Sequence, residues 1–282
     1  MINNQDEIKI GQFSLSYNNK DMTEAIIYEI FHEKIYDFKT GKTAPLIIDA
    51  GSNIGVATIF FKSIYPRAKI CCFEPDPNSF ALLKKNVLNN CLRDITLVNA
   101  ALAGQPGIVD FYGHIDSETP YSCGNSIIKS WGEQRSIYDL NYLNKNKTQV
   151  SAVQLSNYIN EEIDFLKLDV EGAERQVIDE LGDKLNLIKN IAMEIHCTED
   201  PKFINHLGSI ISTLKKYSFH IDVVQKDIVS IFPFQTMEWV KQSKPKLFEL
   251  KACRVAKTIK KVSRFSGLKQ EETLTALEQI SV

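Results

Sequence analysis

Short apolar runs, bounded by glycine, proline or an acid, recur through the first part of the chain. Runs of this kind are typical of parallel strands that are buried on both faces. Between them, apolar residues return every three or four positions, which predicts helices with one buried side. Strands are expected at 46–48, 69–73 and 95–99, and helices at 56–64 and 77–90. This alternation predicts right-handed crossovers and a doubly wound, mostly parallel α/β sheet.

The regular alternation stops between residues 104 and 150. A strand is expected at 108–112, and a long polar stretch follows it. A loop of this length without structure of its own is uncommon inside a compact domain, so the segment is interpreted as an insertion or an active-site lid. Beyond it, strands are expected at 150–155, 163–169, 191–195 and 219–224, and helices at 174–181 and 203–217. Residues 248–255 fit either a last antiparallel strand or the start of a helix.

The expected organisation is a helical lead, one α/β domain and a basic extension. The lead covers residues 1–44, where apolar residues between Ile26 and Ile35 are spaced as on one side of a helix. The α/β domain covers 45–235 and includes the insertion, and the extension covers 236–282.

Charge is distributed unevenly, although the formal net charge is only −2. Residues 241–269 contain ten Lys or Arg and one acid, Glu249, which leaves 23 basic and 34 acidic residues elsewhere. An acidic body argues against a nucleic-acid enzyme, whose basic surface normally surrounds the active site. As a helix, residues 248–262 would be amphipathic and cationic, which suits peripheral contact with an anionic membrane or an acidic partner. Folding back onto the acidic body, or packing in a dimer, is the alternative.

Neither the N-terminus nor the cysteines indicate export. The first residues are polar and lack the apolar core of a secretory signal, and no stretch approaches the ~18 apolar residues of a membrane-spanning helix. The six cysteines show no CxxC spacing, so neither a disulfide framework nor a zinc site is predicted. A cytoplasmic protein with reduced thiols is expected.

Acidic residues close three of the expected strands: Asp49, Glu74 and Asp169. The carboxyl ends of parallel strands meet at one edge of an open sheet, where ligands bind. The first turn at that edge, residues 49–55, reads Asp-Ala-Gly-Ser-Asn-Ile-Gly, with glycines where the backbone must turn sharply and approach a ligand. Glu74 follows Gly55 by 19 residues, a position from which an acid accepts hydrogen bonds from ribose hydroxyls.

The same turn discriminates between adenosine cofactors. Gly51 and Gly55 flank three residues, which departs from the G-x-G-x-x-G of dinucleotide sites, and the Gly-Lys-Ser/Thr of a P-loop is missing from the sequence. The Asp49 carboxylate would repel a phosphate but suits an α-ammonium group. S-adenosylmethionine has that ammonium, a ribose and no phosphate, so it is the predicted cofactor. A nicotinamide cofactor and a glycine turn without a ligand are the alternatives.

Five segments resemble the FkbM family of methyltransferases and stand in that family's order and spacing. The most specific is the Lys-x-Asp-Val-Glu-Gly-x-Glu stretch at 167–174, whereas the glycine turn occurs in many methyltransferases. The resemblance covers roughly residues 45–225, and the chain after about Val224 shows no pattern of the family. The segments are 49–55, 73–75, 99–102, 166–174 and 194–196.

The resemblance implies a class I, Rossmann-like methyltransferase domain at 45–235 with S-adenosylmethionine as methyl donor. Methyl transfer in the family usually goes to an oxygen, mostly to hydroxyls of sugars, glycolipids or polyketide-like natural products. Ala100 and Ser126 match neighbours of the adenine and methionine ends of the cofactor. The complete predicted cofactor-binding set is Asp49, Gly51, Ser52, Asn53, Gly55, Glu74, Pro75, Ala100, Ser126 and Asp169.

Methyl transfer to a hydroxyl requires an acceptor oxygen in line with the sulfonium methyl and a group that takes or shares its proton. The predicted catalytic residues lie at and beyond the carboxyl ends of the strands expected at 163–169 and 191–195 and are Lys167, Asp169, Glu171 and His196, with Glu194 as a further candidate. The pKa of an unperturbed histidine lies near neutrality. His196 or Asp169 is therefore predicted to be the general base, and Lys167 either takes part or pairs with an acid.

Several of these side chains also have other roles open to them. Glu171 and Glu174 lie where a helix is expected to begin, and acids there often act as caps or dipole partners. No metal is assigned, but Asp169, Glu171, Glu194 and His196 offer ligands for one divalent ion. Side chains of the insertion are also predicted to contact the acceptor, because aromatic and polar groups suit the apolar face and the polar edges of a sugar ring. They are Tyr121, Ser122, Asn125, Ser126 and Trp131.

The predicted function is O-methylation of a hydroxyl on a sugar, glycolipid or natural product. N-methylation on the same fold is one alternative. A non-catalytic S-adenosylmethionine-binding or scaffold protein that acts through residues 241–269 is another.

Overall fold

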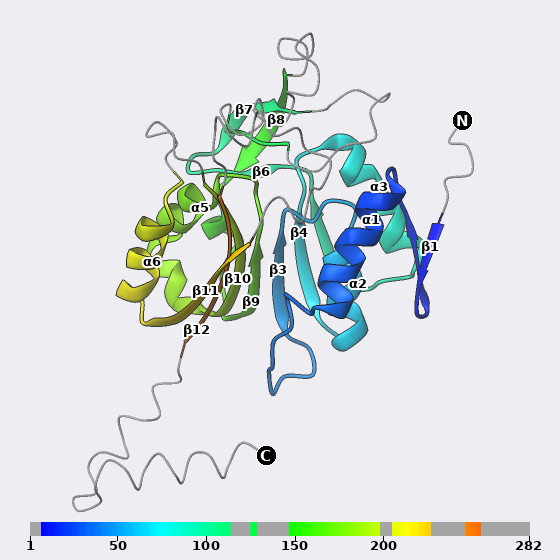
Figure 1. Cartoon of the computed structure of the whole chain (residues 1–282), viewed down its shortest axis with the longest axis horizontal. Coiled ribbons are helices and arrows are strands. Elements are labelled where there is room, and N and C mark those ends of the chain that lie inside the picture. Colours follow the sequence, from blue (N-terminus) through cyan, green and yellow to red (C-terminus); the bar gives the residue numbers. More distant parts are fainter. Residues whose placement is uncertain (1–6, 114–124, 129–146, 198–204, 227–245, 255–282) are drawn as a thin grey trace, which may run out of the picture.

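A seven-stranded sheet organises the residues that this computed structural model describes, which are 7–113, 125–128, 147–197, 205–226 and 246–254. In chain order its strands are β3 (Leu46–Ala50), β4 (Lys69–Phe73), β5 (Ile95–Val98), β9 (Ile163–Leu168), β10 (Ile188–Cys197), β11 (Phe219–Lys226) and β12 (Lys246–Arg254). Across the sheet the order is β11-β12-β10-β9-β3-β4-β5 (Figure 1). Four neighbouring pairs are parallel, and β12 runs antiparallel to β10 and β11.

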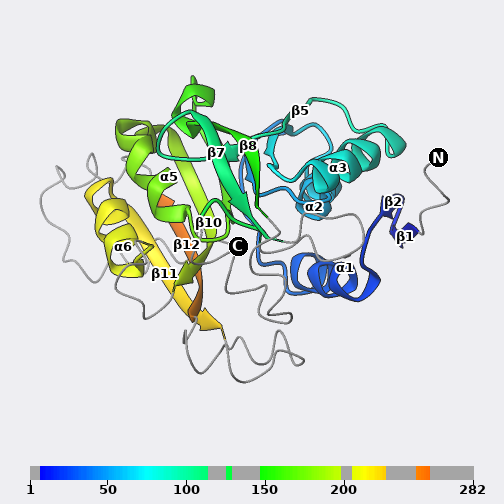
Figure 2. The same ribbon diagram turned by 90° about the horizontal axis from the view of Figure 1, so that it is seen from above.

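Helices cover both faces of this sheet (Figure 2). The helices on one face are α2 (Val56–Ile64) and α3 (Pro77–Asn89), and those on the other are α5 (Glu174–Leu181) and α6 (Leu207–Lys216). Two short 3-10 helices, η2 (Leu155–Tyr158) and η3 (Gly182–Leu187), flank α5 in the sequence. The doubly wound, mostly parallel sheet expected from the sequence is therefore confirmed.

The two layers of the core meet at β9, in which every residue is buried. Phe165 belongs to the apolar cluster that contains Ile59 of α2 and Leu83 of α3. Leu166, the next residue, belongs to the cluster on the opposite face, which includes α5 and α6. Successive side chains of a strand point to opposite faces, so a continuous apolar run is what a strand covered on both sides requires.

The N-terminal segment begins with a hairpin, which the sequence pattern did not predict. β1 (Glu7–Ile10) and β2 (Phe13–Ser16) pair antiparallel, and α1 (Lys20–Ile27) and a π-helical turn, η1 (Tyr28–His32), follow. The predicted apolar stripe between Ile26 and Ile35 packs on the same cluster as α2 and α3. The lead is thus a hairpin and a helix that add to one face of the domain.

Part of the insertion predicted at 104–150 belongs to a second, smaller sheet, whose first strand lies just before the insertion. Its strands are β6 (Ala101–Leu102), β7 (Gly107–Tyr112) and β8 (Lys147–Val153). β8 lies between the other two, parallel to β6 and antiparallel to β7. Tyr112 also forms a bridge with Ser126. This sheet lies at the upper end of the central sheet in Figure 1.

At β12 the structure differs from the prediction of a basic extension outside the α/β domain at 236–282. Residues 246–254 form a strand inside the central sheet, and Leu247, Leu250 and Ala252 are buried. The helical alternative for residues 248–254 is therefore wrong, because two antiparallel partners hold this segment extended. Residues 255–282, which contain the rest of the predicted cationic helix, lie outside the described residues. None of the helices in the described part is long and apolar enough to span a lipid bilayer.

Asn86 gives a test of how the N-terminal hairpin is attached. Its buried amide accepts a hydrogen bond from Ser16 N (2.7 Å) and donates to Ser16 O (2.9 Å) and Ile54 O (2.8 Å). Asn86→Ala should lower the free energy of unfolding by about 2–4 kcal/mol, because each buried polar group left unpaired costs about 1–3 kcal/mol. Urea denaturation measures the loss. Asn89→Ala, at an exposed position of the same helix, is the control, and equal losses in both variants would contradict this attachment.

Candidate active site

The glycine turn after β3 is pressed against the end of β9. Gly51 N and Ser52 N both donate to Phe73 O, at 3.0 and 2.9 Å, which anchors the turn to β4. Gly51 has a φ of +79°, and a Cβ there would lie 1.8 Å from the carbonyl oxygen of Asp169. Only glycine fits this position, because the backbone conformation and the contact both exclude a side chain.

Glu74 joins the glycine turn to the start of α3. Its two carboxylate oxygens accept hydrogen bonds from Asn53 N and Asp76 N, each at 2.8 Å. Burial raises the pKa of the Glu74 carboxyl to about 8, although these two backbone hydrogen bonds act in the opposite direction. The spacing that singled out Glu74 in the sequence thus places its carboxylate directly on the turn.

Asp49 lies beneath the turn and is completely buried. Thr58, in the first turns of α2, donates its hydroxyl to Asp49 Oδ2 at 2.7 Å. Asp49 Oδ1 and Asn53 Oδ1 are buried and have no hydrogen-bond partner among the described residues. The turn therefore presents two acceptor atoms that a bound group with hydrogen-bond donors would satisfy.

Lys167 fastens the ends of β3 and β9 together. Its ammonium group donates to Gly51 O (2.6 Å) and Ala50 O (3.3 Å). The same group lies 3.6 Å from Asp49 Oδ1 and 3.4 Å from Asp169 Oδ2. Burial alone would lower the pKa of Lys167, but the two carboxylates outweigh it and the pKa is raised. The sequence left open whether this lysine pairs with an acid, and the structure pairs it with two.

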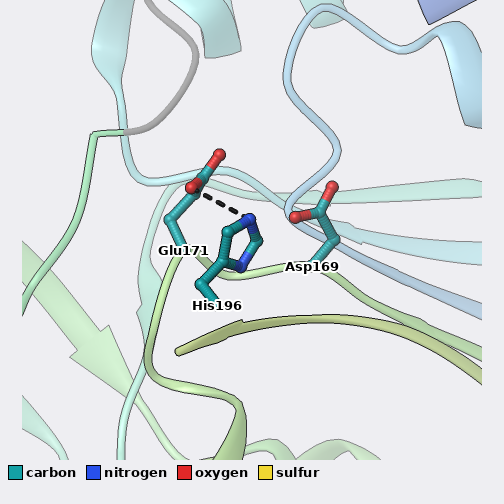
Figure 3. A group of neighbouring side chains, drawn as sticks. All are labelled: Asp169, Glu171 and His196. Atoms are coloured by element: carbon teal, nitrogen blue, oxygen red, sulfur yellow. Dashed lines mark ion pairs between the residues drawn. The ribbon is translucent and has the colours of Figure 1, made fainter. Parts of the chain in front are cut away.

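His196 lies among three carboxylates at the end of β10. Its Nε2 atom is 3.2 Å from Glu171 Oε2 and 3.8 Å from Glu194 Oε2, and its Nδ1 atom is 3.1 Å from Glu174 Oε1 (Figure 3 shows the Glu171 pair). Burial favours the neutral ring, but Glu171 and Glu174 outweigh it and raise the pKa of His196 to about 10.

The buried pair of Glu174 and Asn205 fixes the imidazole from behind. Glu174 accepts hydrogen bonds from Gly172 N (3.0 Å) and from Asn205 Nδ2 (2.5 Å). Asn205 also donates to His196 O at 2.8 Å. Asn205 and Thr58 were not predicted. Asn205 contacts a residue 31 positions away along the chain, and Thr58 reaches Asp49 only once the turn between β3 and α2 has formed.

Asp169 lies between the glycine turn and the histidine cluster, which consists of His196 and the carboxylates of Glu171, Glu174 and Glu194. It closes β9, and its side chain is 22% exposed. Burial raises its pKa, while Lys167 acts in the opposite direction. One ligand atom each from Asp169, Glu171 and His196 lies within 4.8 Å of the other two, so these three side chains could together hold a metal ion (Figure 3).

The predicted residues of the insertion are only partly within the described residues. Ser126 Oγ donates to Glu171 O at 2.5 Å and accepts from Ile128 N at 2.9 Å, so this hydroxyl fixes the turn that carries Glu171. Asn125 Nδ2 donates to Asp76 Oδ2 at 3.2 Å. A contact of Ser126 with the cofactor stays a prediction, as it does for the buried Ala100 and for Pro75. Tyr121, Ser122 and Trp131 lie outside the described residues.

Comparison with known proteins places this chain in a family. A family model described as the methyltransferase FkbM domain matches residues 49–221. Methyltransferase 1 of Beauveria bassiana is 31% identical over 191 residues, which are 61% of this chain and 73% of that protein. Methyltransferase sdnD of Sordaria araneosa is 28% identical over 218 residues, or 68% and 82% of the two chains. The 2-O-methyltransferase NoeI of Sinorhizobium fredii is 30% identical over 160 residues, or 52% and 61%.

The raised pKa of Glu74 predicts a dependence of stability on pH. The folded protein binds the proton of the Glu74 carboxyl more tightly than the unfolded chain, in which the pKa of this group is close to 4.5. The stability that this proton gives to the folded state is therefore lost as the pH rises through about 8. Between about pH 5.5 and 8.5, the free energy of unfolding of the parent should fall by about 1 kcal/mol or more beyond that of Glu74→Gln, since one pKa unit corresponds to about 1.4 kcal/mol.

Urea denaturation at the two pH values, without ligand, makes this measurement. Glu161→Gln, at an exposed position, should keep the pH dependence of the parent. A parent and a Glu74→Gln variant that lose the same stability would show that Glu74 titrates normally in the folded protein.

Proposed function

This chain belongs to the FkbM methyltransferase family and is a methyltransferase, and on that premise we propose that it transfers a methyl group from S-adenosylmethionine to a hydroxyl oxygen of a sugar, glycolipid or natural product. The observation that carries the proposal is the junction of the glycine turn with an acid and imidazole cluster at one edge of the sheet. Lys167 and Asp169 form that junction. A cofactor on the turn would then lie next to groups that can orient an acceptor.

The described residues fit S-adenosylmethionine, which when bound supplies a methyl group on a positively charged sulfur. Glu74 would accept hydrogen bonds from the ribose hydroxyls through the lone pairs that its two backbone contacts leave. The unsatisfied oxygens of Asp49 and Asn53 would accept from further donors such as the ammonium group. Gly51 and Gly55 have positive φ values and let the turn pack closely against Asp169 O and Leu83, which fixes the course of the backbone that would hold the cofactor. The full proposed set is Asp49, Gly51, Ser52, Asn53, Gly55, Glu74, Pro75, Ala100, Ser126 and Asp169.

The side chains beyond the glycine turn, which are those of Asp169, Glu171 and His196, suit an acceptor hydroxyl that must lose a proton. A lone pair of the acceptor oxygen would form the new O–CH3 bond, and the electron pair of the S–CH3 bond would remain on sulfur. The hydroxyl proton would pass to Asp169, or to His196 where that ring is in its neutral form. Glu171 would orient the acceptor or the imidazole, from which its carboxylate is 3.2 Å distant. The contacts of Lys167 with two carbonyls support a positioning role for it. The relative NoeI is named as a 2-O-methyltransferase, which supports transfer to oxygen.

Calorimetric titration tests the cofactor. The parent should bind S-adenosylmethionine and S-adenosylhomocysteine saturably and should not bind NAD. At pH 9, where the Glu74 carboxyl is ionised, Asp49→Asn and Glu74→Gln should each weaken binding about 10- to 100-fold, because a hydrogen bond to a charged group contributes about 1.5–3 kcal/mol. Glu161→Gln is the control. NAD binding, or folded protein that binds neither sulfur compound, would contradict the proposal.

Methyl transfer from labelled S-adenosylmethionine to a panel of hydroxylated sugars and natural products tests the reaction. Asp169→Asn should lower kcat about 10²- to 10⁴-fold, since this is the usual contribution of a group that accepts a proton in the transition state. Nuclear magnetic resonance of the product locates the methyl group. A methyl group on nitrogen would contradict the O-methylation proposal and support the alternative.

A further inference from the structure

We propose that Asp169, Glu171 and His196 bind one divalent cation, which holds the acceptor hydroxyl beside the methyl donor. The acceptor's part in this inference rests on the proposed function, whereas binding of the cation itself does not. The three side chains come from the end of β9, the turn that follows it and β10 (Figure 3). These elements are adjacent because β9 and β10 pair in parallel up to the register of Met193 with Leu168.

The separations of the ligand atoms match a single coordination sphere. Atoms bound to Mg²⁺ or Ca²⁺ at 2.0–2.6 Å lie roughly 3 Å apart when adjacent and roughly 4–5 Å apart when opposed. Here His196 Nε2 and Glu171 Oε2 are 3.2 Å apart, and all three ligand atoms lie within 4.8 Å of one another. Glu194 Oε2, at 3.8 Å from the same nitrogen, is a further possible ligand.

The imidazole is held in the orientation that a metal ligand needs. Its Nδ1 atom lies against the completely buried Glu174, so Nε2 is the atom that faces the other carboxylates. Asn205 and Gly172 N in turn hold Glu174. A carboxylate that accepts the second N–H of a metal-bound histidine, and thereby fixes its tautomer, is the usual outer partner of such a ligand.

An independent observation comes from Asp169. Its Oδ2 atom pairs with Lys167 at 3.4 Å, but Oδ1 is buried and has no hydrogen-bond partner among the described residues. A buried carboxylate oxygen without a partner is costly, and a cation removes that cost. The surrounding charge points the same way, because carboxylates outnumber cationic groups. The five acids are Asp49, Asp169, Glu171, Glu174 and Glu194, whereas the cationic group paired with them is Lys167, because His196 binds a metal ion only as the neutral ring.

The ligand set identifies the class of ion and restricts the chemical class of the acceptor. Carboxylate oxygens with one imidazole nitrogen suit Mg²⁺ or Mn²⁺, which prefer six ligands. Three or four protein ligands leave at least two positions for oxygens of other molecules. An acceptor with two neighbouring oxygens, such as a vicinal diol, would occupy both, and the ion would make its hydroxyl more acidic.

Binding of Mn²⁺ to the 282-residue chain saturated with S-adenosylhomocysteine tests the site, with free Mn²⁺ measured by electron paramagnetic resonance. One saturable site is expected. Glu171→Gln and His196→Gln should each weaken Mn²⁺ binding more than 10-fold, and Glu174→Gln should weaken it about 10- to 100-fold through the imidazole. Glu161→Gln is the control, and circular dichroism checks that every variant is folded.

The outcomes separate this inference from the proposed function. Folded parent protein that shows no saturable Mn²⁺ binding at millimolar concentration would overturn the metal site, as would equal binding by the parent and both ligand variants. Methyl transfer that continues unchanged in excess EDTA would overturn the role of the ion with the acceptor. Failure of S-adenosylhomocysteine to bind would overturn the proposed cofactor alone, because Mn²⁺ binding is then measured on the ligand-free protein.

Discussion

The ammonium group of Lys167 is the interaction on which the geometry of the site depends. A buried charge is stable only when it is paired and hydrogen-bonded, and Lys167 meets this requirement with the carbonyls and carboxylates at the ends of β3 and β9. It separates two acids, Asp49 and Asp169, that would otherwise repel each other inside the protein. The glycine turn on one side and the histidine cluster on the other therefore have a fixed relative position.

Local patterns were sufficient for the central elements of the fold and insufficient for its edges. The observed bounds of α2, β4 and α5 match those expected, because proline, glycine and acids mark their ends in the sequence. β12 was ambiguous, since its apolar residues fit helical spacing as well as a strand. Pairing with β10 and β11, which are distant in sequence, decides its conformation. The hairpin β1–β2 is short, with apolar and polar residues alternating over only four residues in each strand, and it depends on contacts with α3 such as those of Asn86.

The residues of the candidate site likewise divide into those that a local sequence pattern predicts and those that depend on contacts between distant segments. Residues 49–55 and Glu74 could be predicted because a sharp turn and a ribose contact require particular residue types at a particular spacing. The grouping of Asp169, Glu171 and His196 followed from strands that end at one edge. Asn205 could not be predicted, since an asparagine before a helix is common and its contact with Glu174 arises only when α5 and the segment before α6 come together. Ser126 was predicted to contact the cofactor, and this stays a prediction; its hydroxyl also holds the turn of Glu171, a contact between distant segments that no local pattern predicts.

The position of β12 has a consequence for the order in which the protein can be completed during synthesis. β10 carries Glu194 and His196, yet the strand that pairs with its outer edge is the last one described along the chain. On the ribosome, the backbone groups of that edge stay unpaired until residue 254 has emerged from the exit tunnel. An open strand edge is a template for pairing with other chains. A nascent chain that pauses before β12 would thus leave one edge of β10 open, and this edge could pair with other chains and cause aggregation.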